Sequence, residues 1–155
     1  MDDVRPAPAA ESIPAGLWTI ALIALSPFPL SAVAYCYAPS KWTALALTVL
    51  LAWSAVTLSF LGGVRWGLET REPSPRILRQ GFSLLCAVAA VAILLARGRA
   101  PDPWILGGFV VAFLIQWLFD HQTPDTPSRY PLLSTSVTGA ACVSLALAFE
   151  KAMNG

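Results

Sequence analysis

The sequence predicts an all-α polytopic membrane protein, a bundle of about five transmembrane helices whose first helix is kinked. Hydrophobic residues make up 56% of the 155 residues and charged residues 12%, and the mean hydropathy is +0.64, outside the balance of soluble domains. The apolar runs are continuous rather than alternating, which argues against β-barrel strands. Most runs approach the roughly 20 residues that a helix needs to cross the hydrocarbon core.

The chain divides into a tail, one membrane domain and a second tail. Residues 1–14 are polar and rich in Pro and Ala, without the basic start of a signal peptide. A single five-helix domain is expected over 15–150, followed by a tail over 151–155. Aromatic residues close to the ends of the apolar runs fit the headgroup layer, which favours Trp and Tyr. The five crossings are expected at 15–37, 42–64, 79–96, 104–119 and 130–149.

The first segment contains two prolines near its middle, in the run ALSPFPLSA. Pro27 and Pro29 have no backbone N–H, so the carbonyl groups of Ile23 and Leu25 lose their helical partners. A kink is therefore expected near the middle of the bilayer. Such a break can line a ligand cavity or a gate, or it can be one of the prolines that are frequent in membrane helices.

The second segment ends in TLSFLGGVRWGLETRE, where small residues recur at every fourth position. This spacing predicts a shallow face on which another helix backbone packs closely. The fifth segment carries a matching stripe, and we expect the second and fifth helices to pack together inside the bundle. The first stripe consists of Ala55, Ser59, Gly63 and Gly67, and the second of Ser136, Ala140, Ser144 and Ala148, with a parallel stripe of Ser134, Thr138, Cys142 and Ala146 beside it. The predicted helix-packing or interaction motif is Ser59, Gly62, Gly63, Arg65, Trp66 and Gly67.

Arg65 lies at the end of the second segment, with Glu69 and Glu72 four and seven residues further on. As an interfacial anchor, Arg65 would pair with Glu69 and extend toward water or lipid phosphate. The alternative is a polar group that turns into the bundle and holds a ligand or a partner subunit. Arginine stays protonated at physiological pH, which excludes acid–base catalysis by this side chain.

Gln116 and Asp120 form a polar pair near the end of the fourth segment. Gln116 lies within an apolar run, so it needs a hydrogen-bond partner from a neighbouring helix or from Asp120. Asp120 begins the loop DHQTPDTPSRY and is expected to be hydrated. Asp120 and His121 side by side suggest proton handling, or a metal site together with Asp125. The loop holds a single His and no Cys, which argues against a metal site, and we expect a solvated interface turn instead.

Other chemistry has no support in the sequence. Cys36, Cys86 and Cys142 fall in three segments without C-x-x-C spacing, and we expect them to be small buried hydrophobes. No nucleophile elbow, P-loop or zinc-protease motif occurs. A net charge of +1 without a basic cluster argues against a nucleic-acid partner. We therefore expect no cofactor, no metal ion and no enzymatic activity.

The run SFLGGVRWGLE at the end of the second segment resembles the signature of the DUF3429 family. LIQWLFD in the fourth segment and P-x-x-Y ahead of the fifth are further similarities, and the resemblance covers about residues 16–149. It implies a small multipass protein of the bacterial inner membrane, with mitochondrial relatives, and brings no established activity. The chain departs from the family pattern at Arg65, where His is usual, and in YPLLSTSVT, where the family often carries Arg.

These observations predict a non-catalytic subunit or assembly factor that packs in the bilayer against another membrane protein or a second copy. The alternative is a carrier or binder of a small lipophilic molecule, a quinone or a lipid. The expected location is the bacterial inner (plasma) membrane, with the mitochondrial inner membrane as the alternative.

Positive residues on the two sides of the membrane predict the orientation. The N-terminal side holds six, Arg5, Arg65, Arg71, Arg76, Arg79 and Arg129, and the other side holds four, Lys41, Arg97, Arg99 and Lys151. This excess favours a cytoplasmic N-terminus.

Overall fold

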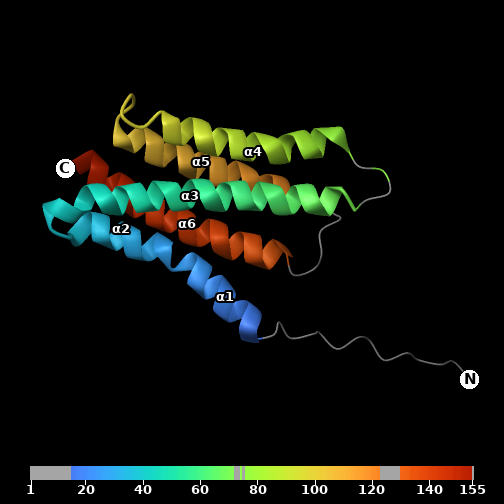
Figure 1. The fold of residues 1–155 in the computed structure, drawn as a ribbon, viewed down its shortest axis with the longest axis horizontal. Coiled ribbons are helices and arrows are strands. Elements are labelled where there is room, and N and C mark those ends of the chain that lie inside the picture. The colour runs from blue at the N-terminus through green and yellow to red at the C-terminus, as the bar shows by residue number, and fades with distance from the viewer. Residues whose placement is uncertain (1–14, 72–73, 75, 123–129, 155) are drawn as a thin grey trace, which may run out of the picture.

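The computed structural model describes residues 15–71, 74, 76–122 and 130–154. This part of the chain forms six helices and no β-strand: α1 (Ala15–Leu25), α2 (Pro27–Tyr37), α3 (Ser40–Glu69), α4 (Ile77–Leu95), α5 (Asp102–His121) and α6 (Tyr130–Asn154). Because α1 and α2 are two halves of the predicted first segment, the expected bundle of about five helical segments is confirmed (Figure 1).

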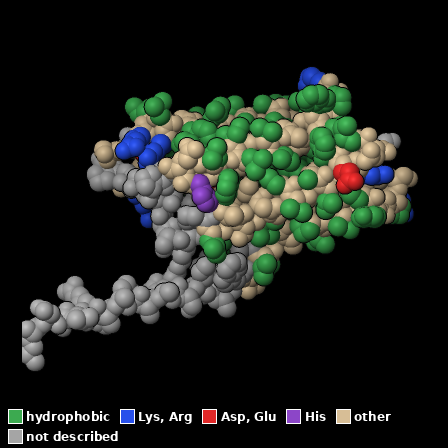
Figure 2. Space-filling view, turned by 180° about the vertical axis from the view of Figure 1, so that it is seen from behind, with side chains coloured by type: hydrophobic (Ala, Val, Ile, Leu, Met, Phe, Trp, Pro, Cys, Tyr) green, Lys and Arg blue, Asp and Glu red, His purple; other side chains and the backbone are tan. Residues whose placement is uncertain are grey.

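The long helices have the dimensions of membrane spans. Four are long and apolar enough to cross a bilayer, namely α3, α4, α5 and Leu132–Asn154 of α6. The 30 residues of α3 correspond to about 45 Å of helix, which exceeds the roughly 30 Å hydrocarbon core. The helix is therefore longer than a straight crossing of this layer requires. On the face that Figure 2 shows, hydrophobic side chains cover the middle of the molecule, and charged groups lie toward its two ends.

The break between α1 and α2 falls at Ser26 and confirms the predicted kink. Pro27 cannot donate to the carbonyl of Ile23, and the Ser26 hydroxyl donates to that oxygen instead, at 2.8 Å. The indole Nε1 of Trp53, on α3, donates to the carbonyl of Ala24 at 3.0 Å. The break is thus supported by side-chain hydrogen bonds, and α1 diverges from the bundle beyond it (Figure 1).

The core surrounds α3. This helix packs mainly along α4 and α2, whereas α6 packs mainly along α5 and α2. The largest fully buried side chains are Phe28, Phe109, Phe113, Leu50, Leu51, Leu58, Leu106 and Leu145. Phe28 and Phe113 meet edge to face, with ring centroids 6.2 Å apart, a favourable aromatic geometry.

The predicted pairing of the second and fifth segments is wrong, because α3 and α6 share little contact. Helices α2 and α5 lie between them instead, because each contacts both α3 and α6. The inward face of α3 carries large side chains such as Leu50 and Leu58. These side chains occupy space that would be lost if another helix backbone packed closely on this face.

Candidate functional site

Helix α5 carries its polar pair into the bundle. Gln116 is fully buried and Asp120 is 2% exposed. The Gln116 amide donates to Asp120 Oδ1 at 3.2 Å and accepts from the Cys86 thiol of α4 at 2.7 Å. The Ser134 hydroxyl of α6 donates to Asp120 Oδ2 at 2.9 Å. Gln116 therefore has both kinds of partner that were expected, one on its own helix and one on a neighbour.

The predicted hydration of Asp120 is wrong. The helix does not end at this residue but continues to His121. Asp120 follows Gln116 by four residues, so both side chains lie on the same inward face of α5. His121 points to the surface, where its ring lies 4.6 Å from that of Trp117.

Arg65 reaches the same place from α3. Its side chain is 3% exposed, and its Nη1 lies 3.9 Å from Asp120 Oδ1. The guanidinium carbon lies 5.5 Å from the centre of the Phe119 ring. Arg65 belongs to the inward face of α3 because it follows the buried Leu58 and Leu61 by seven and four residues. The structure thus supports the alternative that turns Arg65 into the bundle, and the interfacial-anchor interpretation is wrong.

Glu69 forms its contacts with α4 rather than with Arg65. Its Oε1 accepts from the backbone N–H of Arg76 at 2.8 Å, and its Oε2 lies 3.7 Å from Arg79 Nη1. Glu72 lies outside the described residues. These contacts connect the end of α3 to the start of α4. The carboxylate that lies beside Arg65 is therefore that of Asp120 and not that of Glu69.

Two side-chain nitrogens of Arg65 have no acceptor among the described residues. Its Nε and Nη2 are buried and have no hydrogen-bond partner within the described part of the chain. The hydroxyl of Thr138, one turn beyond Ser134 on α6, is likewise buried and unpartnered there. A buried donor without an acceptor costs about 1–3 kcal/mol, and more when it is charged. A hydrogen-bond acceptor on another molecule would remove this cost by binding to Arg65.

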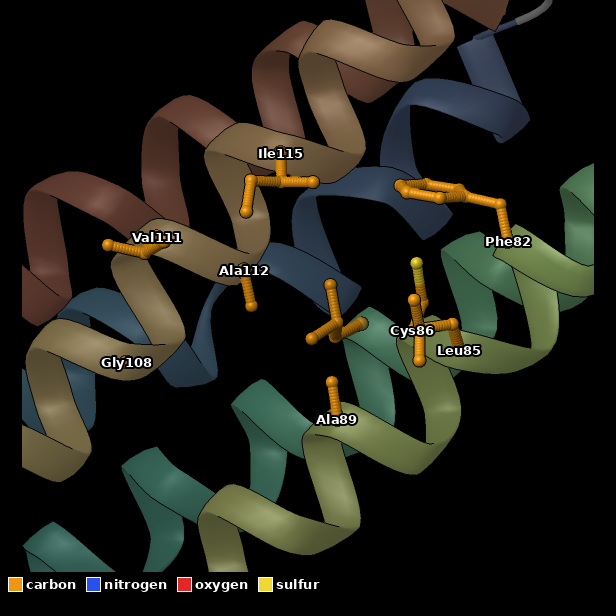
Figure 3. Close-up of a pocket in the computed structure, with 9 residues that line it drawn as sticks. Phe82, Leu85, Cys86, Ala89, Gly108, Val111, Ala112 and Ile115 are labelled. Atoms are coloured by element: carbon orange, nitrogen blue, oxygen red, sulfur yellow. The ribbon is translucent and has the colours of Figure 1, made fainter.

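An apolar groove of about 180 Å³ lies beside this cluster, between α4 and α5 (Figure 3). Its lining residues are Leu58, Phe82, Leu85, Cys86, Ala89, Gly108, Val111, Ala112 and Ile115. Two of them connect the groove to the polar cluster. Cys86 donates to Gln116, and Phe82 stacks on Phe119 with ring centroids 3.9 Å apart. One end of the groove therefore adjoins the buried cluster of Arg65, Gln116 and Asp120.

The predicted interaction motif of α3 divides into an inward and an outward part. A Cβ at Gly62 would lie 2.6 Å from the backbone oxygen of Ser83 and 3.3 Å from Cys86 Cβ, so this glycine permits close approach of α3 and α4. At Gly63 and Gly67 a Cβ would meet nothing described within 4 Å.

The remaining members of the motif follow the same division. Arg65 is buried, as Gly62 is. Trp66 is 44% exposed, and Ser59 is partly buried. The predicted packing stripe through Gly63 and Gly67 is therefore wrong as a contact inside this chain. Successive residues of a helix are rotated by about 100° about its axis. Gly62 therefore faces α4, whereas Gly63 faces away from it.

Several members of the site were not identified from the sequence. Cys86 was expected to be a small buried hydrophobe, and Ser134 to belong to a packing stripe, yet both are hydrogen-bonded in the cluster. Neither residue stands in a motif that marks this role. No group of three or more potential metal ligands occurs among the residues described, and Asp125 lies outside them.

Comparison with known proteins places most of the chain in one family. Residues 13–150 match the family model described as Protein of unknown function (DUF3429). No curated protein and no solved structure shows significant similarity to the chain.

Proposed function

Since the chain belongs to the DUF3429 family of proteins of unknown function, we propose a role from its geometry: a non-catalytic membrane protein that binds a small lipophilic molecule between α4 and α5. One observation carries the proposal. The apolar groove between these helices adjoins a buried polar cluster in which two nitrogens of Arg65 have no hydrogen-bond partner among the described residues. Apolar walls with a few convergent polar groups are the usual composition of a small-molecule site.

The position of the groove suits a molecule that arrives from the bilayer. Leu85, Val111 and Ile115 line the groove, and each is more than half exposed on the outer surface of the bundle. A lipophilic molecule could therefore enter sideways without crossing water. Gln116 and Asp120 are hydrogen-bonded within the cluster, which supports binding and orientation of a ligand rather than its chemical conversion.

The test compares bound small molecules in matched variants. The full-length protein is purified in a mild detergent, and co-purifying lipids and quinones are identified by mass spectrometry. Ala112→Leu adds volume inside the groove, whereas Ala146→Leu adds the same volume at an exposed position on α6. We expect Ala112→Leu to lose a lipophilic molecule that the wild type and Ala146→Leu retain. Equal amounts in all three proteins would contradict the proposal.

A second candidate function is the accessory membrane subunit predicted from the sequence. The observation that favours it is the outward face of α3, where Gly63 and Gly67 leave open space beside the exposed Trp66. Two glycines four residues apart allow a helix of another protein to approach closely. Under this function, the face would contact a partner subunit.

Affinity purification with a matched control tests this second function. Gly63→Leu with Gly67→Leu blocks the outward face of α3, and Gly139→Leu is the control because Gly139 also faces open space, on α6. A partner should co-purify with the wild type and with the control but not with the double variant. Retention by the double variant would contradict a subunit contact at this face.

The proposal also includes the cellular setting. We propose the bacterial inner membrane, with a cytoplasmic N-terminus. The membrane-length helices support a location in a membrane, and the excess of positive residues on the N-terminal side supports the orientation.

A further inference from the structure

We propose that Arg65 recognises a neutral carbonyl group at the head of the bound lipophilic molecule. This inference rests on the proposed function and adds the chemical class of the ligand. Its basis is the two buried nitrogens of Arg65 that have no partner among the described residues, the charges around them, and the aromatic side chains that lie between the groove and the guanidinium.

The free donors of Arg65 form one edge of its guanidinium group. Nε and Nη2 are the two buried nitrogens without a partner among the described residues, while Nη1 faces Asp120 at 3.9 Å. In a guanidinium group, Nε–H and the neighbouring Nη–H point in the same direction and act as a fork. This edge can therefore hold one oxygen with two lone pairs, and it needs no movement of Asp120.

The charges of the cluster favour a neutral acceptor over an anion. The buried Arg65 faces Asp120, and the partly buried Arg79 faces Glu69, so each of these two cations already has a carboxylate beside it. An anionic head at Arg65 would bring a second negative charge close to Asp120 without a cation of its own. Burying an uncompensated charge is costly, whereas a hydrogen-bonded carbonyl adds no charge. The balance of charge thus selects a carbonyl oxygen rather than a carboxylate or phosphate.

The walls between the groove and Arg65 are apolar and aromatic. Phe82 lines the groove and stacks on Phe119, and Phe119 is the ring that contacts the guanidinium of Arg65. Figure 3 shows Phe82 and Cys86 on α4 facing the space that Ala112 and Ile115 line from α5. A flat ring or an acyl chain fits such walls. A quinone and an ester-linked lipid both combine a neutral carbonyl with an apolar body, and they are the two sources of this chemistry.

Binding isotherms on the full-length protein in detergent test the inference with three probes. Decylubiquinone carries quinone carbonyls, monoolein carries a neutral ester, and oleate carries a carboxylate on a comparable chain. We expect at least one neutral probe to bind the wild type at least about tenfold more tightly than oleate. Binding of decylubiquinone identifies the quinone source, and binding of monoolein the lipid source.

Variants then assign the recognition to Arg65. Arg65→Lys keeps the positive charge beside Asp120 but removes the planar fork, and it should weaken the neutral probe about tenfold. Arg97→Lys is the matched control, because Arg97 contacts Thr48 rather than the cluster. Melting curves verify that each variant is folded, and the comparison of the three probes on the wild type requires no variant.

The outcomes separate the two proposals. Tighter binding of oleate than of both neutral probes would overturn the neutral-carbonyl inference while leaving a lipophile site in place. Neutral-probe binding that is the same in folded Arg65→Lys and in the wild type would overturn the role of Arg65. If none of the three probes binds and no lipophilic molecule co-purifies, the proposed function fails together with the inference.

Discussion

Adjacent glycines on α3 have opposite environments. A methyl group at Gly62 would clash with the backbone oxygen of Ser83, which cannot rotate away as a side chain can, whereas the same group at Gly63 would meet open space. We expect Gly62→Ala to destabilise the protein by about 1–3 kcal/mol through overpacking, and Gly63→Ala to leave stability nearly unchanged. Thermal melting of both variants in one detergent measures the difference. Equal losses would show that Gly63 is also packed.

The buried pair of Arg65 and Asp120 gives a second prediction for single residues. Asp120→Asn preserves the size of the side chain but leaves the Arg65 charge uncompensated, and breaking a buried pair in this way costs about 3–5 kcal/mol. In Arg65→Met with Asp120→Asn both charges are absent. Unfolding free energies should therefore show a smaller loss in the double variant than the sum of the single losses. Additive losses would mean that the two charges do not interact.

Among the elements, the broken first segment combines sequence-encoded and tertiary features. Pro27 and Pro29 account for the break, while α2 is anchored in the core by Phe28 and Ala32. We expect Pro27→Ala with Pro29→Ala to straighten the segment with little loss of melting temperature, because the buried side chains of α2 are unchanged. The double variant should also retain any lipophilic molecule bound between α4 and α5. Mass spectrometry checks this, and loss of the molecule would show that the kink shapes the site.

For the whole molecule, the arrangement of the helices predicts the membrane topology. The start of α1 and the α3–α4 connection lie at one end of the bundle, and the C-terminus lies at the other (Figure 1). Because Arg65 is buried in the bundle, it no longer counts as a loop residue, and the positive residues remain in excess on the N-terminal side. Reporter fusions should place the EPSPR connection in the cytoplasm and Gly155 outside it. A cytoplasmic signal from a Gly155 fusion to intact, inserted protein would contradict this topology.

The sequence by itself determined the class of the protein and the positions of its helices. Long apolar runs require helices in a bilayer, since a helix satisfies its own backbone hydrogen bonds there. Two prolines determined the break near Ser26, because they remove backbone donors. The four-residue spacing of Gln116 and Asp120 placed both on one face of α5. All of these features depend on local chemistry, which the sequence contains in full.

Only the tertiary structure decided which face of each helix turns inward. In a soluble helix the polar stripe marks the outside, but in a bilayer both the lipid-facing and the core-facing sides are apolar, so the pattern does not reveal the rotation. The sequence therefore could not separate Gly62 from Gly63, or show that Arg65 meets Asp120. Those assignments depend on how α3, α4 and α5 pack together. This packing places Arg65, two of whose nitrogens have no partner within the described part of the chain, close to an apolar groove.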